Sequence, residues 1–458
     1  MIANKITGMR NIHFVGIGGI GMSGIARILK NMGFSVSGSD LKKSDVTDEL
    51  IALGIPVYIG HTADNIKDSG VMVTSSAISP GNSELIAAKE KKVTIIHRGE
   101  MLAELMRLKY GIAVAGTHGK TTTTAMVTAV CIAGGLGPTS IIGGKWVGIN
   151  SNAELGKSEY LICEADESDG SFLRLSPIIN IVTNIDIDHM DYYKTEENLI
   201  SHFADFINKV PFFGKSVVCG DDNRIKALIT RIRKPYITYG LNAGSDLRIY
   251  DIGMEKDLMV FHAAIHGRDL GIFRLGIAGA HNVLNSAAAI AVGLELEIPL
   301  ETIKKSLGKF VGVNRRMTKL GNWEGFAVYD DYGHHPTEIK ATLEAFRYKT
   351  DNLIVLFQPH RYTRTLDHYE AFSHSFGAAS SVYISGIYPA GEKPVEGVSS
   401  KLIADKMKGR QNVYYDEDPD RLLALIKKNH VTQKGIILTI GAGDIYKYGQ
   451  MLTANGEL

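Results

Sequence analysis

The sequence predicts an α/β protein made of three consecutive doubly wound domains, at residues 1–106, 107–312 and 313–458. Its 458 residues exceed what one hydrophobic core usually supports. Short apolar runs also alternate with helical patterns of about 10–15 residues, which is typical of βαβ units with parallel sheets. In such sheets ligands bind where the strands end, and most polar clusters of this chain lie at strand ends.

The composition excludes several functional classes. The chain has 50 basic and 49 acidic residues, a net charge of +1, so it lacks an electrostatic footprint for nucleic acid or an anionic membrane. No apolar stretch is long enough to cross a bilayer, and the glycine-rich run from Ile12 is not followed by a signal-cleavage site. Its three cysteines lack metal-like spacing and fit a reducing compartment. We therefore expect a cytoplasmic protein that binds neither nucleic acid nor membrane.

The first domain opens with a glycine-rich turn. NIHFVGIGG is a strand that enters this turn, MSGIARILKNMG is a helix, and FSVSGSD and GVMVTSSAI are further strands. Gly16, Gly18 and Gly21 have the G-x-G-x-x-G spacing, and Asp40 follows 19 residues after Gly21. The pattern predicts a Rossmann-like domain that binds a diphosphate at the helix N-terminus, beside a ribose or sugar hydroxyl. A nicotinamide dinucleotide and a UDP-sugar both offer these groups, and a turn that only packs helix on strand is a further alternative.

The second domain begins with the strand GIAVAG, which runs into GTHGKTTTT at residues 116–124 and then a helix. Only Thr117 and His118 separate Gly116 from Gly119, so this loop is two residues shorter than the common ATPase phosphate loop. The strand, both glycines and the positive helix N-terminus are all present. They predict a P-loop ATPase-like domain, in which Lys120 contacts phosphate and the next residue binds Mg²⁺. The alternative is a threonine-rich helix cap with a chance lysine.

Acidic residues follow the next strands of this domain. YLICEAD places Glu164 at a strand end, where phosphate-loop proteins hold a metal ligand. VTNIDIDHMD places Asn184, Asp186 and His189 at another strand end. A lone histidine there is more often structural, but among carboxylates and downstream of a phosphate loop we interpret His189 as a second metal ligand.

The third domain starts near VNRRMTKLG. Its strands are FAVYDDY, NLIVLFQPH, SVYISGIYP and GIILTIGAGD, with helices such as PTEIKATLEAFRY and DPDRLLALIKK between them. The alternation again predicts a Rossmann-like, doubly wound sheet.

The motifs taken together resemble one enzyme family. GIGGIGMSGIA, SSAI, AGTHGKTTTTAM, EADESDGSF, VTNIDIDHMD, AHNVLNSAAA, DDYGHHPTEI and QPHRYTRT are similar to the ATP-dependent Mur ligases of peptidoglycan synthesis, in the branch that adds L-alanine to UDP-N-acetylmuramate. The resemblance covers almost the whole chain and includes the short phosphate loop. It implies that the first domain binds the UDP part of the substrate, the second binds ATP, and the third brings the amino acid and closes over the site.

The resemblance also implies roles for individual residues. It implies that the UDP-substrate is bound by Gly18, Gly21, Asp40 and Ser75, and that Mg²⁺ is bound by Thr121, Glu164 and His189. The ATP site would comprise Gly116, Thr117, His118, Gly119, Lys120, Thr121, Thr122, Asn282, Asn285, Arg315 and Asp330 or Asp331. The amino acid would be received by Tyr332, His334, Arg361 and Arg364, and the catalytic residues would be Lys120, His189, Arg315 and His334. Outside the family context, Asn282 and Asn285 would equally be ordinary helix-terminal residues, and the arginines surface residues.

The implied reaction transfers the γ-phosphoryl of ATP to the lactyl carboxylate of UDP-N-acetylmuramate. The amine of L-alanine then attacks the acyl phosphate, with His334 as a candidate base. ATP and Mg²⁺ are the expected cofactors, UDP-N-acetylmuramate and L-alanine the expected partners, and a monomer or weak homodimer the expected state.

Three alternatives differ in what they leave unexplained. A murein tripeptide-recycling ligase shares the phosphate loop but normally opens with G-I-C-G-T-F-M-G-G, whereas this chain has GIGGIGMSG. A nicotinamide-dependent oxidoreductase uses GIGGIG and Asp40 but leaves GTHGKTTTT and Glu164 without a role. A non-enzymatic nucleotide switch predicts no product. The chain departs from the family in HRGEML, where Gly99 stands in place of the expected alanine beside Arg98.

Overall fold

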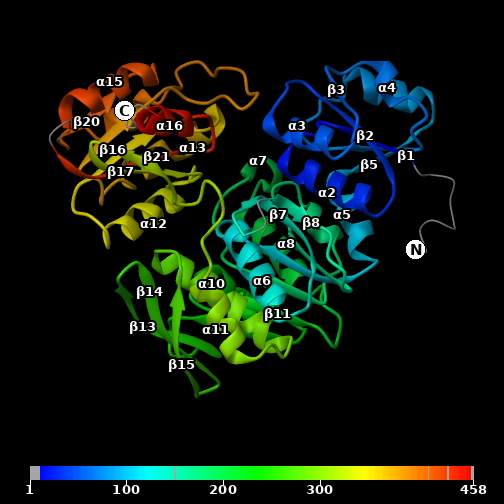
Figure 1. Cartoon of the computed structure of the whole chain (residues 1–458), viewed down its shortest axis with the longest axis horizontal. Helices are drawn as coiled ribbons and strands as arrows, with labels where there is room; N and C mark the ends of the chain where they lie inside the picture. The colour runs from blue at the N-terminus through cyan, green and yellow to red at the C-terminus, as the bar shows by residue number, and fades with distance from the viewer. Residues whose placement is uncertain (1–10, 149–150, 411, 431–432, 455–458) are drawn as a thin grey trace. The chain divides into compact units, whose positions relative to one another are not determined.

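The computed structural model describes residues 11–148, 151–410, 412–430 and 433–454, and Figure 1 draws the whole chain. The chain forms two compact units. The first comprises Met1–Ile252, Val260–Leu275 and Leu284–Val311, and the second comprises Gly253–Met259, Gly276–Val283 and Gly312–Leu458. Among the described residues, no helix is long and apolar enough to cross a membrane.

The first unit begins with a five-stranded parallel sheet in the order β3-β2-β1-β4-β5. The strands are β1 (Asn11–Val15), β2 (Ser35–Asp40), β3 (Val57–Ile59), β4 (Val71–Thr74) and β5 (Thr94–His97). Between them lie α2 (Ile20–Asn31), α3 (Asp45–Ala52), η1 (Ala63–Ile66), α4 (Ser83–Glu90) and α5 (Arg98–Met106). The strand order reverses between β1 and β4, and this switch point is where such sheets bind ligands. The predicted Rossmann-like start is confirmed.

The same unit continues in a ten-stranded sheet with the order β15-β14-β13-β12-β11-β10-β6-β9-β7-β8. The phosphate-loop strand β6 (Tyr110–Ala115) lies between β10 (Ile179–Val182) and β9 (Tyr160–Glu164), parallel to both. The other strands are β7 (Thr139–Trp146), β8 (Ser151–Glu154), β11 (Lys215–Cys219), β12 (Tyr236–Gly240), β13 (Leu247–Glu255), β14 (Leu258–Ile265) and β15 (Arg268–Leu275). Because parallel neighbours end at one edge, the segments after β6, β9 and β10 meet there.

Helices connect and cover these strands. They are α6 (Lys120–Ala133), η2 (Ser171–Arg174), α7 (Met190–Tyr193), α8 (Glu196–Ile207), α9 (Asn223–Leu228), η3 (Ile229–Arg231), α10 (Ala280–Glu295) and α11 (Leu300–Gly308). The sequence analysis did not identify β13, β14 and β15, which lie side by side in Figure 1. Exposed polar residues interrupt the buried positions of β13 and β15, as in Leu247, Arg248 and Ile249, so these two strands lack the continuous apolar run of a central parallel strand. Strand β14 does carry an apolar run, LMVF followed by His262.

The second unit holds a six-stranded sheet in the order β16-β17-β21-β18-β19-β20, with only the edge strand β16 antiparallel. Its strands are β16 (Thr318–Trp323), β17 (Gly325–Asp331), β18 (Leu353–Phe357), β19 (Ser381–Ile384), β20 (Val413–Tyr415) and β21 (Lys434–Ile440). Its helices are α12 (Pro336–Phe346), α13 (Tyr362–Ser373), α14 (Lys401–Lys406), α15 (Pro419–His430) and α16 (Tyr446–Ala454).

Strand β18 shows why helices cover both faces of this sheet. Its side chains alternate between two hydrophobic clusters: Val355 and Phe357 belong to one, Ile354 and Leu356 to the other. Successive side chains of a strand point to opposite faces, so a fully apolar strand needs cover on both sides. The predicted doubly wound α/β class is confirmed here.

Candidate active site

The segment GTHGKTTTT joins β6 to α6 and turns sharply at its two glycines. Gly116 has a φ of 127° and Gly119, the N-cap of α6, a φ of 84°. A Cβ on Gly116 would lie 2.1 Å from Thr183 Oγ1, and one on Gly119 would lie 2.6 Å from Asn285 Oδ1. Both positions therefore require glycine for conformation and for space. The loop ends at a helix N-terminus, as a phosphate cradle requires.

The residues that follow β10 hold this short loop in shape. Asn184 Oδ1 accepts a hydrogen bond from His118 N at 2.9 Å, and Asn184 Nδ2 donates to His118 O at 3.0 Å. Thr183 Oγ1 donates to the same carbonyl at 2.6 Å. Thr117 Oγ1 accepts from Asp186 N at 2.8 Å. These bonds from a neighbouring strand fix the loop, a role that the sequence analysis did not assign to Thr183 or Asn184.

Lys120 is held by a buried ion pair. Its Nζ donates to Gly116 O at 2.6 Å, to Thr117 O at 3.1 Å and to Glu167 Oε1 at 2.8 Å. Burial disfavours the charge of Lys120, but Glu167, with Glu164 and Asp166, outweighs this effect and raises the pKa of Lys120. The lysine is therefore a fixed cation at the loop. Glu167 was not among the predicted site residues, although it lies in the acidic run EADES.

Of the predicted metal ligands, Thr121 lies in α6, Glu164 ends β9, and His189 lies in the segment after β10. Glu164 Oε1 accepts from Gly143 N at 3.0 Å, and a Cβ on Gly143 would meet Glu164 Oε2 at 2.3 Å. His189 Nε2 lies 3.9 Å from Glu167 Oε1. The oxygen donors Thr121 and Glu164 fit Mg²⁺, which commonly takes one or two protein oxygens and completes its shell with phosphate and water, whereas His189 offers a nitrogen.

The glycine fingerprint follows β1. Gly16 has a φ of 78°, and Gly18 N donates to Asp40 Oδ2 at 2.9 Å. A Cβ on Gly18 would meet that carboxylate oxygen at 2.8 Å, so the second glycine lets Asp40 approach the loop. Ser75 directly follows β4, and its carbonyl accepts from Ile78 N at 3.1 Å. Gly18 and Asp40 are brought together, and Ser75 lies beyond the end of the strand next to β1.

The two helix asparagines are both in α10 and both buried. Asn282 Nδ2 donates to Ala278 O at 2.7 Å. Asn285 lies against Gly119 of the phosphate loop, since its Oδ1 is only 2.6 Å from the position that a Cβ on Gly119 would take. The structure thus brings Asn285 to the loop, and the nucleotide-binding role of both residues stays a prediction.

In the second unit, Arg315 is held inside its own unit. Its φ is 60°, its Nε donates to Asp330 Oδ2 at 3.0 Å, and its Nη2 donates to Gly441 O at 2.7 Å. Asp330 and Asp331 are both buried, and burial raises the pKa of each carboxyl, that of Asp331 to about 6. Asp331 accepts from the backbone N–H groups of Gly333 and Met317, both at 2.8 Å, and so shapes the turn to Tyr332. The predicted contacts of Arg315 with phosphate and of either aspartate with a ribose remain predictions.

The predicted amino-acid residues follow β17 and β18 of this unit. The rings of Tyr332 and His334 meet edge to face at 5.4 Å, and His334 lies 5.8 Å from the ring of His360. Arg364 Nη1 lies 3.5 Å from His360 Nδ1. Tyr332, His334 and Arg364 therefore belong to one cluster. His360 joins this cluster through the QPH motif and was missed as a site residue.

Charge in this cluster is distributed unevenly. Burial lowers the pKa of His334 to about 3 and that of His360 to about 4, so both imidazoles are neutral near pH 7. Neutral His334 can accept a proton, but such a low pKa makes it a weak base. Arg361 Nε donates to Glu392 Oε1 at 2.7 Å, so this guanidinium is paired within the unit. Arg364 is the more buried arginine.

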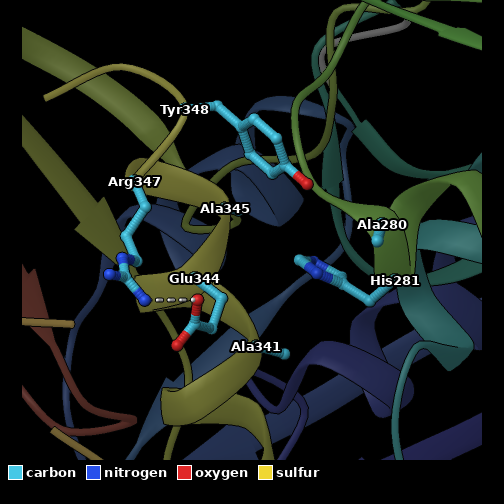
Figure 2. A pocket seen from close by; sticks show the side chains of 7 residues that line it. All are labelled: Ala280, His281, Ala341, Glu344, Ala345, Arg347 and Tyr348. Carbon is cyan, nitrogen blue, oxygen red and sulfur yellow. Dashed lines mark hydrogen bonds and ion pairs between the residues drawn. The ribbon is translucent and has the colours of Figure 1, made fainter. Parts of the chain in front are cut away.

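A separate hollow of about 350 Å³ lies between the start of α10 and α12. Figure 2 shows His281 and Tyr348 pointing into it, and an ion pair between Glu344 and Arg347 on its α12 side. Burial lowers the pKa of His281 to about 4, so its imidazole is neutral. None of its lining residues is a predicted site residue.

Comparison with known proteins identifies the family. Three family models match along the chain: the Mur ligase family catalytic domain at residues 11–110, the Mur ligase middle domain at 114–293 and the Mur ligase glutamate ligase domain at 315–443. Relatives named UDP-N-acetylmuramate–L-alanine ligase include those of Desulfatibacillum aliphaticivorans, 48% identical over 97% of this chain and 98% of the relative, and Geotalea daltonii, 48% identical over 97% of both.

Solved structures agree. The UDP-N-acetylmuramate–alanine ligase of Thermotoga maritima has a TM-score of 0.83 and 29% identity, and the match covers 97% of this chain and 98% of that one. A murein peptide ligase from Psychrobacter arcticus has a TM-score of 0.74 at 22% identity over 98% and 99% of the two chains, a likeness of fold alone. Family models match most of the chain, and one sheet edge carries a glycine-shaped loop with a fixed lysine and adjacent acids. This chain therefore belongs to the Mur ligase family.

Proposed function

We propose that the chain joins L-alanine to the carboxylate of UDP-N-acetylmuramate at the expense of ATP, in peptidoglycan precursor synthesis. The observation that carries this proposal is near full-length identity of 48% to relatives that bear this activity in their names. The loop geometry supports ATP as the activating substrate, since Gly116 and Gly119 shape a cradle beside a fixed cation. The oxidoreductase alternative would leave that loop without a role.

The reaction proceeds in two steps. A carboxylate oxygen of UDP-N-acetylmuramate attacks the γ-phosphorus of ATP, ADP leaves, and an acyl phosphate forms. The amine of L-alanine attacks the acyl carbon, the tetrahedral intermediate loses inorganic phosphate, and the proton of the amine passes to a base or to water. Because the first step concentrates negative charge, its catalysis depends chiefly on fixed positive groups.

The residues of this chain supply those groups. Lys120 neutralises phosphate oxygens, and Thr121, Glu164 and His189 would hold Mg²⁺, which when bound stabilises the charge of the transferred phosphoryl group. Arg361 and Arg364 would receive the carboxylate of the amino acid, the group that a guanidinium matches best, and Arg361 would do so beside its bond to Glu392. The domain division at residues 106 and 312, a cytoplasmic location and a monomeric or weakly dimeric state complete the proposal. Three buried free cysteines, Cys131, Cys163 and Cys219, are consistent with a reducing compartment.

The proposal is tested by phosphate release with ATP and Mg²⁺. We expect release to require both UDP-N-acetylmuramate and L-alanine, to stop on chelation of divalent cations and to fall at least a hundredfold in Lys120→Ala. Glycine, L-serine and the recycled tripeptide serve as competing amine substrates. Faster release with the tripeptide than with L-alanine would identify the recycling ligase instead, and stabilisation by NAD(H) but not by ATP or UDP-sugar would contradict a ligase altogether.

A further inference from the structure

The start of α5 is clasped to the acidic segment that follows β9. Two ion pairs and one histidine–carboxylate contact join them: Arg98 Nη2 lies 2.6 Å from Asp166 Oδ2, and Arg174 Nη1 lies 3.1 Å from Glu100 Oε2. His97 Nε2 lies 3.6 Å from Asp169 Oδ2, and burial lowers the pKa of this imidazole. In each contact, one residue lies at the end of β5 or in α5, beside the five-stranded sheet, and the other follows β9 of the ten-stranded sheet. The clasp connects the glycine-fingerprint sheet with the segment that carries Glu164 and Glu167.

Gly99 permits this close approach. A Cβ on Gly99 would lie 2.5 Å from Ser171 Cβ and 2.9 Å from Ser171 Oγ. The departure from the expected alanine at this position therefore has a physical reason, because with Ser171 opposite, an alanine would force the two segments apart. The absent methyl group brings the backbone beside Arg98 against the acidic segment.

Arg98 also contacts the glycine fingerprint. Its Nη1 lies 2.8 Å, and its Cδ 3.2 Å, from where a Cβ on Gly21 would be. Gly21 is the third glycine of the fingerprint and belongs to the first turn of α2. In such motifs the third glycine usually allows close packing of helix on strand. Here a guanidinium occupies that space.

The two ends of the guanidinium thus face different groups. Nη2 donates to Asp166, and the Arg98 charge helps to lower the pKa of that carboxyl to about 2 against the opposing effect of burial. Nη1 lies over Gly21 and makes no hydrogen bond within the part of the chain that the structure describes. A free N–H pair of a guanidinium at a helix N-terminus is suited to a phosphate oxygen.

We propose that Arg98 binds the diphosphate of the UDP-linked substrate through Nη1 while Nη2 keeps its bond to Asp166. The inference rests on the proposed UDP-substrate and adds Arg98 to the residues predicted to bind it, which are Gly18, Gly21, Asp40 and Ser75. One guanidinium then links the bound substrate to the segment that holds Glu164 and Glu167, so substrate binding steadies the acids beside the phosphate loop. Lysine cannot replace it, because a single ammonium lacks the two-sided fork.

Calorimetric titration with UDP and with UMP tests the proposal on the full chain. We expect Arg98→Met to weaken UDP binding at least tenfold and UMP binding less than threefold, because the variant keeps the aliphatic stem and loses the contact with the diphosphate. Arg98→Lys should regain less than half of the loss. Arg174→Met, which breaks another pair of the same clasp, is the matched control and should change UDP affinity less than twofold.

A purely structural role for Arg98 makes a different prediction. It requires Asp166→Asn to weaken UDP binding as much as Arg98→Met, whereas our proposal expects less than a threefold change, since Nη1 remains in place. Equal losses of UDP and UMP affinity, or equal effects of Arg98→Met, Asp166→Asn and Arg174→Met, would overturn the inference alone. Wild-type protein that binds neither UDP nor UDP-N-acetylmuramate would overturn the proposed function with it, and the wild-type titration separates the two failures.

Discussion

Glycine at the N-cap of α6 gives a sharp test of the phosphate loop. Gly119 and Gly135 lie at opposite ends of this helix with nearly equal φ values of 84° and 79°. Alanine at either position must adopt a left-handed conformation, which costs about 1–2 kcal/mol. The two positions differ in their surroundings: a Cβ on Gly119 would meet Asn285 Oδ1 at 2.6 Å, and one on Gly135 meets nothing within 4 Å. The pair separates the conformational cost from the steric one.

The steric effect follows from the distance. Ordinary contact begins at 3.4 Å, so in Gly119→Ala the loop or Asn285 must move by the difference between 3.4 and 2.6 Å, which is 0.8 Å. Rotating Asn285 out of a favoured rotamer costs about 0.5–1.5 kcal/mol. Moving the loop instead shifts the N–H groups that are proposed to hold phosphate, and a misplacement of about 1 Å lowers catalysis by about a hundredfold.

The measurement is kcat/KM for ATP, together with the thermal midpoint of each variant. We expect Gly119→Ala to lower kcat/KM for ATP between about tenfold and a hundredfold. Gly135→Ala should stay within twofold of wild type, although both variants lower the midpoint by the shared conformational cost. Equal activity of the two variants would refute the reasoning, because the contact with Asn285 would then have no bearing on ATP.

Two further predictions concern buried carboxyl groups. Glu167→Gln removes the charge that raises the pKa of Lys120, and breaking a buried ion pair costs about 3–5 kcal/mol, less where an amide keeps the hydrogen bond. We therefore expect this variant to have a lower thermal midpoint and at least a tenfold loss of phosphate release. Glu154→Gln, at an exposed strand residue, is the control, and equal behaviour of the two variants would contradict the role of the Glu167–Lys120 pair. Burial raises the pKa of Asp331 from 3.8 to about 6. Between these two pH values the folded chain therefore keeps a proton on Asp331 that the unfolded chain has lost. The stability that this protonated group contributes below pH 4 is lost as the pH rises to 6. The difference between these two pKa values corresponds to about 3 kcal/mol. Asp331→Asn should flatten that part of the thermal midpoint's pH dependence, and an unchanged slope would exclude Asp331 as its source.

The sequence by itself determined the local units of this protein. Apolar runs that alternate with helical periods predicted the doubly wound sheets, and the glycine spacings predicted the turns at Gly16 and Gly116. These features could be predicted because a turn with positive φ, a helix N-terminus and a buried strand each depend on residues close together in the chain. Strands β13 and β15 were not predicted because exposed polar residues interrupt their apolar positions, and the apolar run of β14 between them was overlooked.

Only the tertiary structure decided which side chains serve those units. The pairing of β10 and β9 with β6 places Asn184 on His118 and Glu167 on Lys120, and the packing of α5 against α2 places Arg98 on Gly21. Each contact joins residues far apart in the chain, so it depends on the order of the strands in the sheet and on which helices pack together. Such neighbours cannot be inferred from local periodicity, because the same run of residues fits several strand orders. The glycines of the loop can be recognised from neighbouring residues in the sequence, whereas the residues that hold the loop and its lysine come from distant segments and are known only from the structure.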